Sequence, residues 1–215
     1  VGFYFARDVH QRTGVPIGIL DDCEGGSVIE SWMAPEGMEP IRELADRVAA
    51  RNKALAAYYS TDLPKAIGEM EQWIAEAKAA SPQSPLMRRP PEIPAPQGAG
   101  YYNAMIRPAM RLPVKGVLWY QGETGGDGGY DHRMRALVGG WRQHWGLGDL
   151  PFYFVQLPGF GKPNENPAGG DGWVGVRAAQ FRAQSITNTG MIVTIDIGEA
   201  KEIHPRNKFD VGTRL

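Results

Sequence analysis

Short apolar runs alternate with longer amphipathic segments in the second half of the chain, and this alternation limits the possible folds most. Val114 to Tyr120, Phe152 to Leu157 and Met191 to Ile197 are apolar runs of strand length. Between them, Tyr130 to Trp145 and Val176 to Ser185 repeat apolar residues at helical spacing. Strands that alternate with helices indicate an α/β fold, with a mostly parallel sheet and helices on both faces.

The first half of the chain predicts three helices and one more strand. Val1 to Gln11 reads as a helix, and Pro40 to Tyr58 and Leu63 to Ala80 repeat apolar residues at helical spacing. Val15 to Leu20 is an apolar run of strand length. The whole chain therefore predicts four strands, and Arg206 to Leu215 predicts the start of a last helix.

Ser81 to Gly100 joins the two halves and contains six prolines. This density is incompatible with a helix or a central strand, so the segment predicts an extended surface connection. We expect one domain over residues 1–215, because neither side alone holds enough strands for a sheet. Both ends read as cut, since Val1 opens in a helix and Leu215 falls inside one. A doubly wound fold normally starts with a strand that reaches the site, so we expect a first strand and its loop before Val1.

Composition excludes several classes of protein. The 215 residues are 42% hydrophobic and 22% charged, which is ordinary for a globular domain. The net charge of −1 gives no electrostatic basis for binding nucleic acid or an anionic membrane. No apolar run approaches the ~18 residues of a membrane-spanning helix, and the sequence from Val1 to Phe5 does not resemble a signal peptide. Cys23 is the single cysteine, which leaves a catalytic thiol open but excludes an intrachain disulfide.

Polar side chains follow one predicted strand where parallel sheets bind ligands. Gln121, Gly122 and Glu123 come directly after the Val114 to Tyr120 run. The Gln121 amide can donate to a developing oxyanion, and the Glu123 carboxylate can hold a loop or a substrate hydroxyl. The alternative is that both side chains merely cap a turn.

Two adjacent glycines follow the Val15 to Leu20 run. Gly25 and Gly26 let backbone N–H groups approach a ligand closely, as an oxyanion hole requires, or they form a tight turn. Ser27 offers a hydroxyl nucleophile, although its surroundings do not match the Gly-x-Ser-x-Gly elbow.

His204 lies just past the last predicted strand and is the candidate catalytic base. A catalytic histidine needs a carboxylate to orient it, and Asp196, Glu199 and Glu202 are near in sequence. The alternative is a solvated loop histidine. The other histidines fall in predicted helices away from strand ends, where a structural or solvent-facing position is expected: His10, His132 and His144. No spacing of acids and histidines matches a metal site, so no metal is predicted.

Four blocks together resemble the sialate O-acetylesterase family of carbohydrate esterases, within the SGNH hydrolase superfamily. Their order and spacing cover nearly the whole chain. The blocks are Val15–Leu20 with Gly25–Trp32, Tyr102–Pro108, Gly116–Glu123, and Asn188–Lys208 with Val211–Leu215.

This resemblance implies a serine esterase on a three-layer α/β/α sandwich with a flavodoxin-like sheet. The family nucleophile is a serine in a Gly-Gln-Ser-Asn-type block after the first strand, and we expect that block before Val1. His204 matches the catalytic histidine, Gly25 and Gly26 match the oxyanion glycines, and Gln121 to Glu123 match the third block. No metal or organic cofactor is implied, and the resemblance alone predicts a secreted or periplasmic protein.

Two departures from the family pattern concern the site. Asp22-Cys23-Glu24 stands where the family usually has a Ser-Ser-Trp-like run. Lys201 occupies the place of the superfamily's triad aspartate, so Glu202, two residues before His204, is the predicted triad acid.

The sequence therefore predicts an acetylesterase that removes acetyl groups from O-acetylated sugars such as sialic acid by a serine-histidine mechanism. Two alternatives stay open. One is an acetylxylan or pectin acetylesterase, and the other is a non-catalytic carbohydrate-binding remnant of the same fold.

Overall fold

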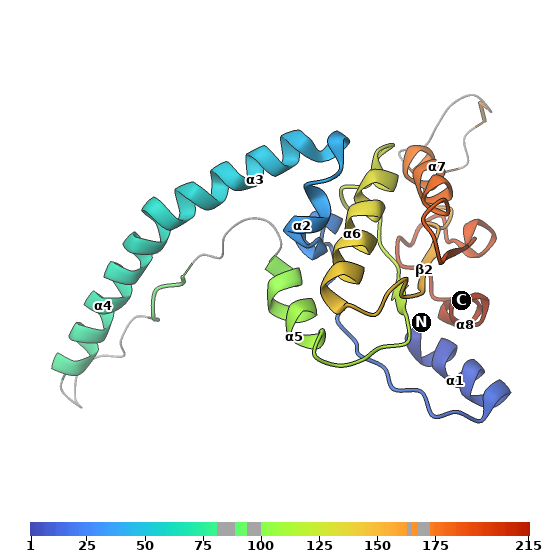
Figure 1. Ribbon diagram of the computed structural model, residues 1–215, viewed down its shortest axis with the longest axis horizontal. Coiled ribbons are helices and arrows are strands. Elements are labelled where there is room, and N and C mark those ends of the chain that lie inside the picture. Colours follow the sequence, from blue (N-terminus) through green and yellow to red (C-terminus); the bar gives the residue numbers. More distant parts are fainter. Residues whose placement is uncertain (81–88, 94–99, 163–164, 167–172) are drawn as a thin grey trace.

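A computed structural model describes residues 1–80, 89–93, 100–162, 165–166 and 173–215, and it has an α/β fold (Figure 1). The helices are α1 Gly2–Thr13, α2 Pro35–Met38, α3 Ala45–Ala57, α4 Leu63–Ala79, α5 Arg107–Ala109, α6 Tyr130–Trp145, α7 Val174–Ala183 and α8 Lys208–Arg214. Short 3-10 turns lie at Ile29–Trp32, Arg42–Leu44 and Ile195–Ile197, and π-helical turns at Tyr58–Asp62 and Tyr102–Ile106. Most of the predicted Ser81 to Gly100 connection lies outside the described residues.

Three parallel strands form the sheet, in the order β1-β2-β3. The strands are β1 Val117–Trp119, β2 Phe152–Val155 and β3 Thr189–Ile192. Helix α6 joins β1 to β2, and α7 joins β2 to β3, so both crossovers predicted from the alternating pattern are confirmed. All three strands therefore end at the same edge of the sheet.

Helices lie against both faces of the sheet. Trp119 and Phe152 belong to the buried core and their rings pack on Trp141 of α6. Tyr120 is the next residue after Trp119, so its side chain points to the opposite face. There the Lys208 ammonium, at the start of α8, lies 5.4 Å from the centre of the Tyr120 ring. Helix α1 in turn packs on α8, which gives the α/β/α layering (Figure 1).

The prediction of four strands is wrong for the part of the chain that the structure describes. Val15 to Leu20 is extended but pairs with no described strand, and Val15, Ile19 and Leu20 are at least half exposed. A strand requires a neighbour to receive its backbone hydrogen bonds, and this segment finds none among those residues. The apolar run alone could not reveal this.

Strand β3 is also shorter than predicted, because the chain turns after Val193. The backbone of Thr194 leaves the extended region, with φ −130° and ψ 12°. Its hydroxyl donates to the carbonyl of Gln156 at 2.6 Å, and its own carbonyl accepts from the N–H of Ile197 at 3.1 Å. These bonds fix a 3-10 turn where the sequence predicted strand to Ile197.

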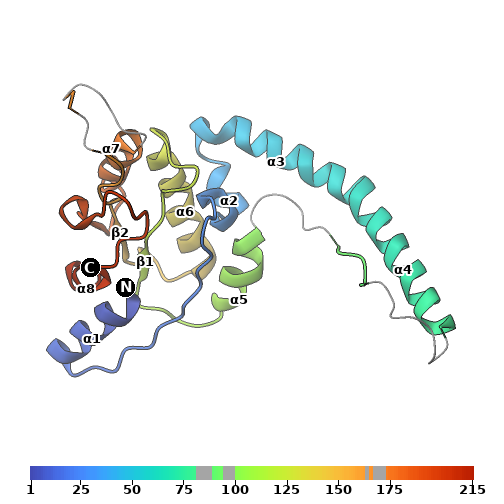
Figure 2. The ribbon, with the colours of Figure 1, turned by 180° about the vertical axis from the view of Figure 1, so that it is seen from behind.

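Helices α3 and α4 confirm the two helices predicted from residues 40–80. They run almost end to end through the π-helical turn and extend away from the sheet (Figure 2). Ile67 and Ile74, which made α4 recognisable as amphipathic, are therefore partly exposed.

Helix α2 approaches α6 so closely that glycine is needed at the contact. A Cβ placed on Gly37 would lie 2.2 Å from the carbonyl oxygen of Ala136 and 2.8 Å from the Cα of Gly140. Both neighbours are backbone atoms, so a side chain there must push the two helices apart.

We expect Gly37→Ala to lower the free energy of unfolding by roughly 1–3 kcal/mol through overpacking. Gly139→Ala is the matched control, because a Cβ on Gly139 meets no atom within 4 Å. That change should be neutral or stabilise by up to about 1 kcal/mol through helix propensity. Chemical denaturation of both variants tests this, and equal effects would contradict the close packing.

Candidate active site

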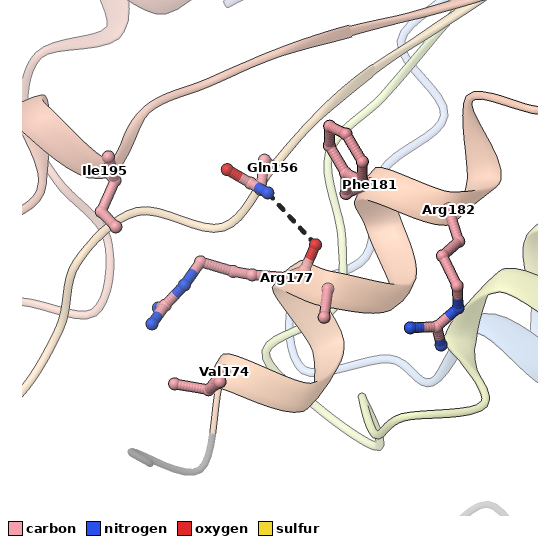
Figure 3. A pocket seen from close by; sticks show the side chains of 7 residues that line it. Gln156, Val174, Arg177, Phe181, Arg182 and Ile195 are labelled. Atoms are coloured by element: carbon pink, nitrogen blue, oxygen red, sulfur yellow. Dashed lines mark hydrogen bonds between the residues drawn. The ribbon is translucent and has the colours of Figure 1, made fainter. Parts of the chain in front are cut away.

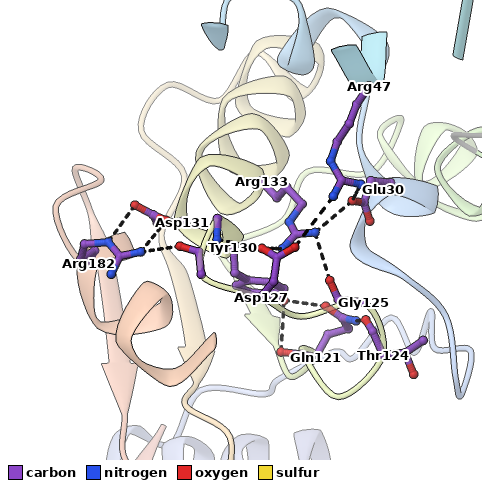
Figure 4. A network of polar contacts seen from close by, with 12 residues as sticks. Glu30, Arg47, Gln121, Thr124, Gly125, Asp127, Tyr130, Asp131, Arg133 and Arg182 are labelled. Atoms are coloured by element: carbon purple, nitrogen blue, oxygen red, sulfur yellow. Dashed lines mark hydrogen bonds and ion pairs between the residues drawn. The ribbon is translucent and has the colours of Figure 1, made fainter. Parts of the chain in front are cut away.

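Gln121 joins the loop that follows β1 to the glycine block, which comprises residues 25–27. Its Nε2 donates to the carbonyl of Ser27 at 3.0 Å. The same nitrogen donates to the carbonyl of Thr124 at 2.9 Å (Figure 4). These bonds bring the Gln121 amide beside Ser27, the residue that follows Gly26. Both amide hydrogens are occupied here, so Gln121 positions the two loops, and its role as an oxyanion donor stays a prediction.

A buried hydrogen-bond network fixes the orientation of Gln121. The hydroxyl of Tyr130 donates to Oε1 of Gln121 at 2.6 Å and accepts from the indole of Trp119 at 3.0 Å. Gln180, on α7, donates from Nε2 to the backbone carbonyl of Gln121 at 3.1 Å. Tyr130 is fully buried, so every polar group in the network needs its partner. The sequence pattern alone gave no sign of this network.

The glycine block has the geometry of a turn that a ligand could approach. Gly26 has a φ of +74°, a left-handed conformation that favours glycine. A Cβ placed on Gly25 or Gly26 would meet no atom within 4 Å, so the space beside both is open. This space is compatible with the predicted oxyanion hole.

Ser27 and Cys23 are poorly prepared as nucleophiles in this structure. The Ser27 hydroxyl donates to the carbonyl of Glu24 at 2.7 Å and accepts from the indole of Trp32 at 2.9 Å. Partial burial, followed by the hydrogen bond to Asp21, raises the pKa of Cys23 to about 11. A thiol with this pKa stays protonated at neutral pH and is a weak nucleophile.

His204 lies on an exposed turn after β3, with 75% of its side chain accessible. Oε1 of Glu202 accepts a hydrogen bond from the backbone N–H of His204 at 2.9 Å, and the same oxygen lies 3.7 Å from Nδ1 of the ring. That separation exceeds a hydrogen bond, so Glu202 caps the backbone here. Its predicted role as triad acid stays a prediction.

The other two candidate acids are engaged elsewhere. Asp196 forms a bidentate ion pair with Arg214, with both contacts at 2.7 Å. Glu199 accepts from the backbone N–H of Arg206 at 2.7 Å. In the described part of the chain, Glu202 is thus the acid with an oxygen within 4.0 Å of the His204 ring.

Glu123 is partly buried, and the charge of His204 affects the pKa of its carboxyl. Burial raises the pKa of the Glu123 carboxyl, and the positive charges of His204 and Lys208 oppose that rise. Burial likewise lowers the pKa of Lys208, while Glu123 and the acids at 199 and 202 oppose the fall. The contact that links the third block to the segment after His204 is that of the Lys208 ammonium with the Tyr120 ring, at 5.4 Å. No described hydrogen bond or ion pair joins His204 directly to Gly26 or Gln121.

The remaining histidines have structural contacts, as their helical positions predicted. Nδ1 of His10 bonds the carbonyl of Val15, and His132 lies 3.7 Å from a carboxylate oxygen of Glu43. His144 bonds the buried hydroxyl of Tyr102.

An open hollow of about 450 Å³ lies beside the sheet edge (Figure 3). Gln156 of the loop after β2 forms part of it, with Val174, Arg177 and Phe181 of α7 and Ile195 of the last 3-10 turn. None of the predicted site residues lines it. Across the described ranges, no group of three or more histidine, cysteine or acidic residues could hold a metal ion, and no helix has the length and apolar character to cross a membrane.

Similarity to known protein families shows which family the chain belongs to. A family model described as carbohydrate esterase, sialic acid-specific acetylesterase, matches residues 87–213, more than half of the chain. The chain belongs to this carbohydrate esterase family. The matched residues include the third block and His204.

Relatives of this esterase family match the whole chain. It is 27% identical to the sialate O-acetylesterase of Rattus norvegicus and 25% identical to that of Homo sapiens, and it covers 41% and 37% of their lengths. A crystal structure of a carbohydrate acetylesterase from Xanthomonas citri is 33% identical, with a TM-score of 0.65, over the whole of this chain and 39% of that one. The chain thus spans about two-fifths of the length of these relatives.

The Gln121 network gives a direct test of how firmly this esterase site is held. We expect Tyr130→Phe to lower the free energy of unfolding by about 1–3 kcal/mol, because it leaves the Trp119 indole and the Gln121 amide oxygen buried without a partner. Tyr153→Phe is the control, since Tyr153 is 38% exposed on β2. Denaturant titration that finds equal small losses for both variants would argue against the network.

Proposed function

We propose that this chain forms the histidine-bearing part of an acetylesterase that removes acetyl groups from O-acetylated sugars. Two contacts between the family blocks support the proposal. Gln121 bonds the carbonyl of Ser27, directly after Gly26, and the Lys208 ammonium, four residues after His204, lies 5.4 Å from the Tyr120 ring centre in the third block. Acyl transfer needs these parts together, namely a base and a backbone site for an oxyanion.

The proposed reaction has two steps. A serine hydroxyl attacks the acetyl carbonyl while His204 takes its proton, and the backbone N–H groups near Gly26 hold the tetrahedral oxyanion. The protonated His204 then gives that proton to the departing sugar oxygen, and an acetyl-serine is left. In the second step His204 takes a proton from water as the water oxygen attacks the acetyl-serine, and it returns that proton to the serine oxygen as the ester bond breaks and acetate leaves.

The serine of this scheme is proposed to come from outside these 215 residues. Ser27, the serine nearest the glycine block, has its hydroxyl bonded to Glu24 and Trp32. Strand β1 pairs with β2 on one edge, and its other edge pairs with no strand in the described ranges. A strand added there would end beside Gln121, where a serine on the following loop could reach the site. The single domain over residues 1–215 is thus proposed to be completed by this strand.

Glu202 is proposed as the acid that orients His204. A rotation of its side chain could bring the carboxylate from 3.7 Å to hydrogen-bond distance of Nδ1, and such bonds often tighten only when substrate is bound.

We expect Glu202→Gln in the full-length protein to reduce kcat by roughly 10²- to 10⁴-fold, because an amide cannot stabilise an imidazolium as a carboxylate does. Glu199→Gln is the matched control, since the side chain of Glu199 accepts from the backbone N–H of Arg206. Steady-state kinetics on an aryl acetate would make the comparison. Undiminished turnover by Glu202→Gln would remove it from the triad.

The proposed substrate is an acetylated carbohydrate, with O-acetylated sialic acid as the first choice. The names of the family and of its mammalian relatives support that choice. An acetylxylan or pectin esterase is the second candidate, because the Xanthomonas citri relative is described only as a carbohydrate acetylesterase. Secretion stays a prediction from the family resemblance, and a non-catalytic binding module is the alternative outside enzymes.

Acetate release by the full-length protein separates these alternatives. We expect release from O-acetylated sialic acid to exceed release from acetylxylan. His204→Ala should lower the rate by at least ~10²-fold without unfolding, while His10→Ala, an exposed helical histidine, should leave it unchanged. Binding of the sugar without acetate release would favour the binding module, and full activity of His204→Ala would contradict the mechanism.

A further inference from the structure

Arg133 is a buried cation that links two loops of the site. It lies near the start of α6 and is only 2% exposed. Its guanidinium contacts Glu30 at 3.2 Å, the carbonyl of Gly125 at 3.0 Å and Asp127 at 2.5 Å (Figure 4). Charges are almost never buried this deeply unless they are paired, so both carboxylates are needed to hold Arg133.

The partners of Arg133 come from separate parts of the chain. Glu30 lies three residues after Ser27, in the 3-10 turn Ile29–Trp32. Gly125 and Asp127 belong to the loop after β1. Arg47 of α3 contacts the same oxygen of Glu30 at 2.5 Å and a carboxylate oxygen of Asp127 at 3.9 Å, but its side chain is 47% exposed. The guanidinium of Arg133 is therefore the buried cation that joins the two loops.

Two side chains bond both loops and so fix the position of one loop relative to the other. On the first loop, Gln121 bonds the carbonyl of Ser27, and Arg133 bonds the carboxylate of Glu30. On the other loop the same two side chains bond Thr124 and Gly125. The proposed oxyanion donors near Gly26 and the carboxylate of Glu123 are thus carried by segments that cannot move independently.

We propose that Arg133 is a positioning residue for the esterase reaction, and this rests on the function proposed above. It sets the distance between the Gly26 backbone and the loop that carries Glu123. Misplacing an oxyanion donor weakens an interaction that is realised in the transition state, so its loss lowers kcat more than it raises KM.

Only arginine fits this role fully. Its planar fork donates to two carboxylates and a carbonyl at once, whereas a lysine ammonium is a compact charge on a flexible stem. A lysine at position 133 would keep the charge but could not match the same fork. Methionine would keep the apolar stem but remove the buried charged link between the loops.

Arg142 on the same helix provides a matched control. Its guanidinium also bonds backbone carbonyls, at 2.8 Å to Leu150 and 2.8 Å to Thr187. Those carbonyls precede β2 and β3, at the edge of the sheet opposite to the site. Arg142→Met should therefore lower stability without changing the site.

The experiment compares Arg133→Met, Arg133→Lys and Arg142→Met in the full-length protein, with kcat and KM for an aryl acetate measured well below each variant's unfolding temperature. We expect Arg133→Met to lower kcat roughly 10- to 100-fold with KM changed less than about 3-fold. Arg133→Lys should recover part of the lost kcat. Arg142→Met should keep kcat within about 2-fold of the parent, even if it lowers the unfolding temperature as much as Arg133→Met does.

Hydrogen exchange followed by mass spectrometry gives a readout that needs no substrate. Arg133→Met should speed exchange in peptides covering residues 24–32 and 121–129, and Arg142→Met should not. Unchanged exchange in both peptides, or a kcat for Arg133→Met equal to that of Arg142→Met, would overturn the proposal. A parent protein without acetylesterase activity would instead overturn the proposed function, and the exchange data would still report whether Arg133 joins the loops.

Discussion

The buried amide of Gln121 is the contact on which the site depends. It lies at the end of β1, where it accepts from Tyr130 and donates to the glycine block at Ser27. Because these groups are removed from water, each must keep its partner, and the network therefore specifies one arrangement of the loops. The short parallel sheet provides the rigid edge, and the amide transfers that rigidity to a loop that would otherwise be free to move.

The charged groups at this edge form two sets with different structural roles. Arg133 neutralises acids from two loops in a buried position, and so holds the backbone. The side chain of His204 is exposed, while burial raises the pKa of the Glu123 carboxyl and the positive charges of His204 and Lys208 oppose that rise. The His204 side chain thus stays accessible while Arg133 holds the loops at residues 30 and 125–127.

Sequence patterns predicted the elements whose stability is local. Helices α3, α4, α6 and α7 follow apolar spacing, and Gln121 and Glu123 stand at a strand end because the run before them is apolar. Patterns failed where a neighbour decides the outcome. Val15 to Leu20 has the composition of a strand but no described partner, and the burial of Arg133 depends on two acids that lie far from it in sequence. Likewise, nothing in the order of Glu202 and His204 revealed that the carboxylate would bond the backbone instead of the ring.

The central claim is that these 215 residues carry the histidine and the oxyanion glycines of an esterase whose nucleophile lies elsewhere. The most direct test is to treat the full-length protein with an organophosphonate that reacts with activated serines and to map the adduct by mass spectrometry. The account predicts a single labelled serine outside Val1–Leu215, with labelling abolished by His204→Ala. An adduct on Ser27, or labelling that does not depend on His204, would contradict it.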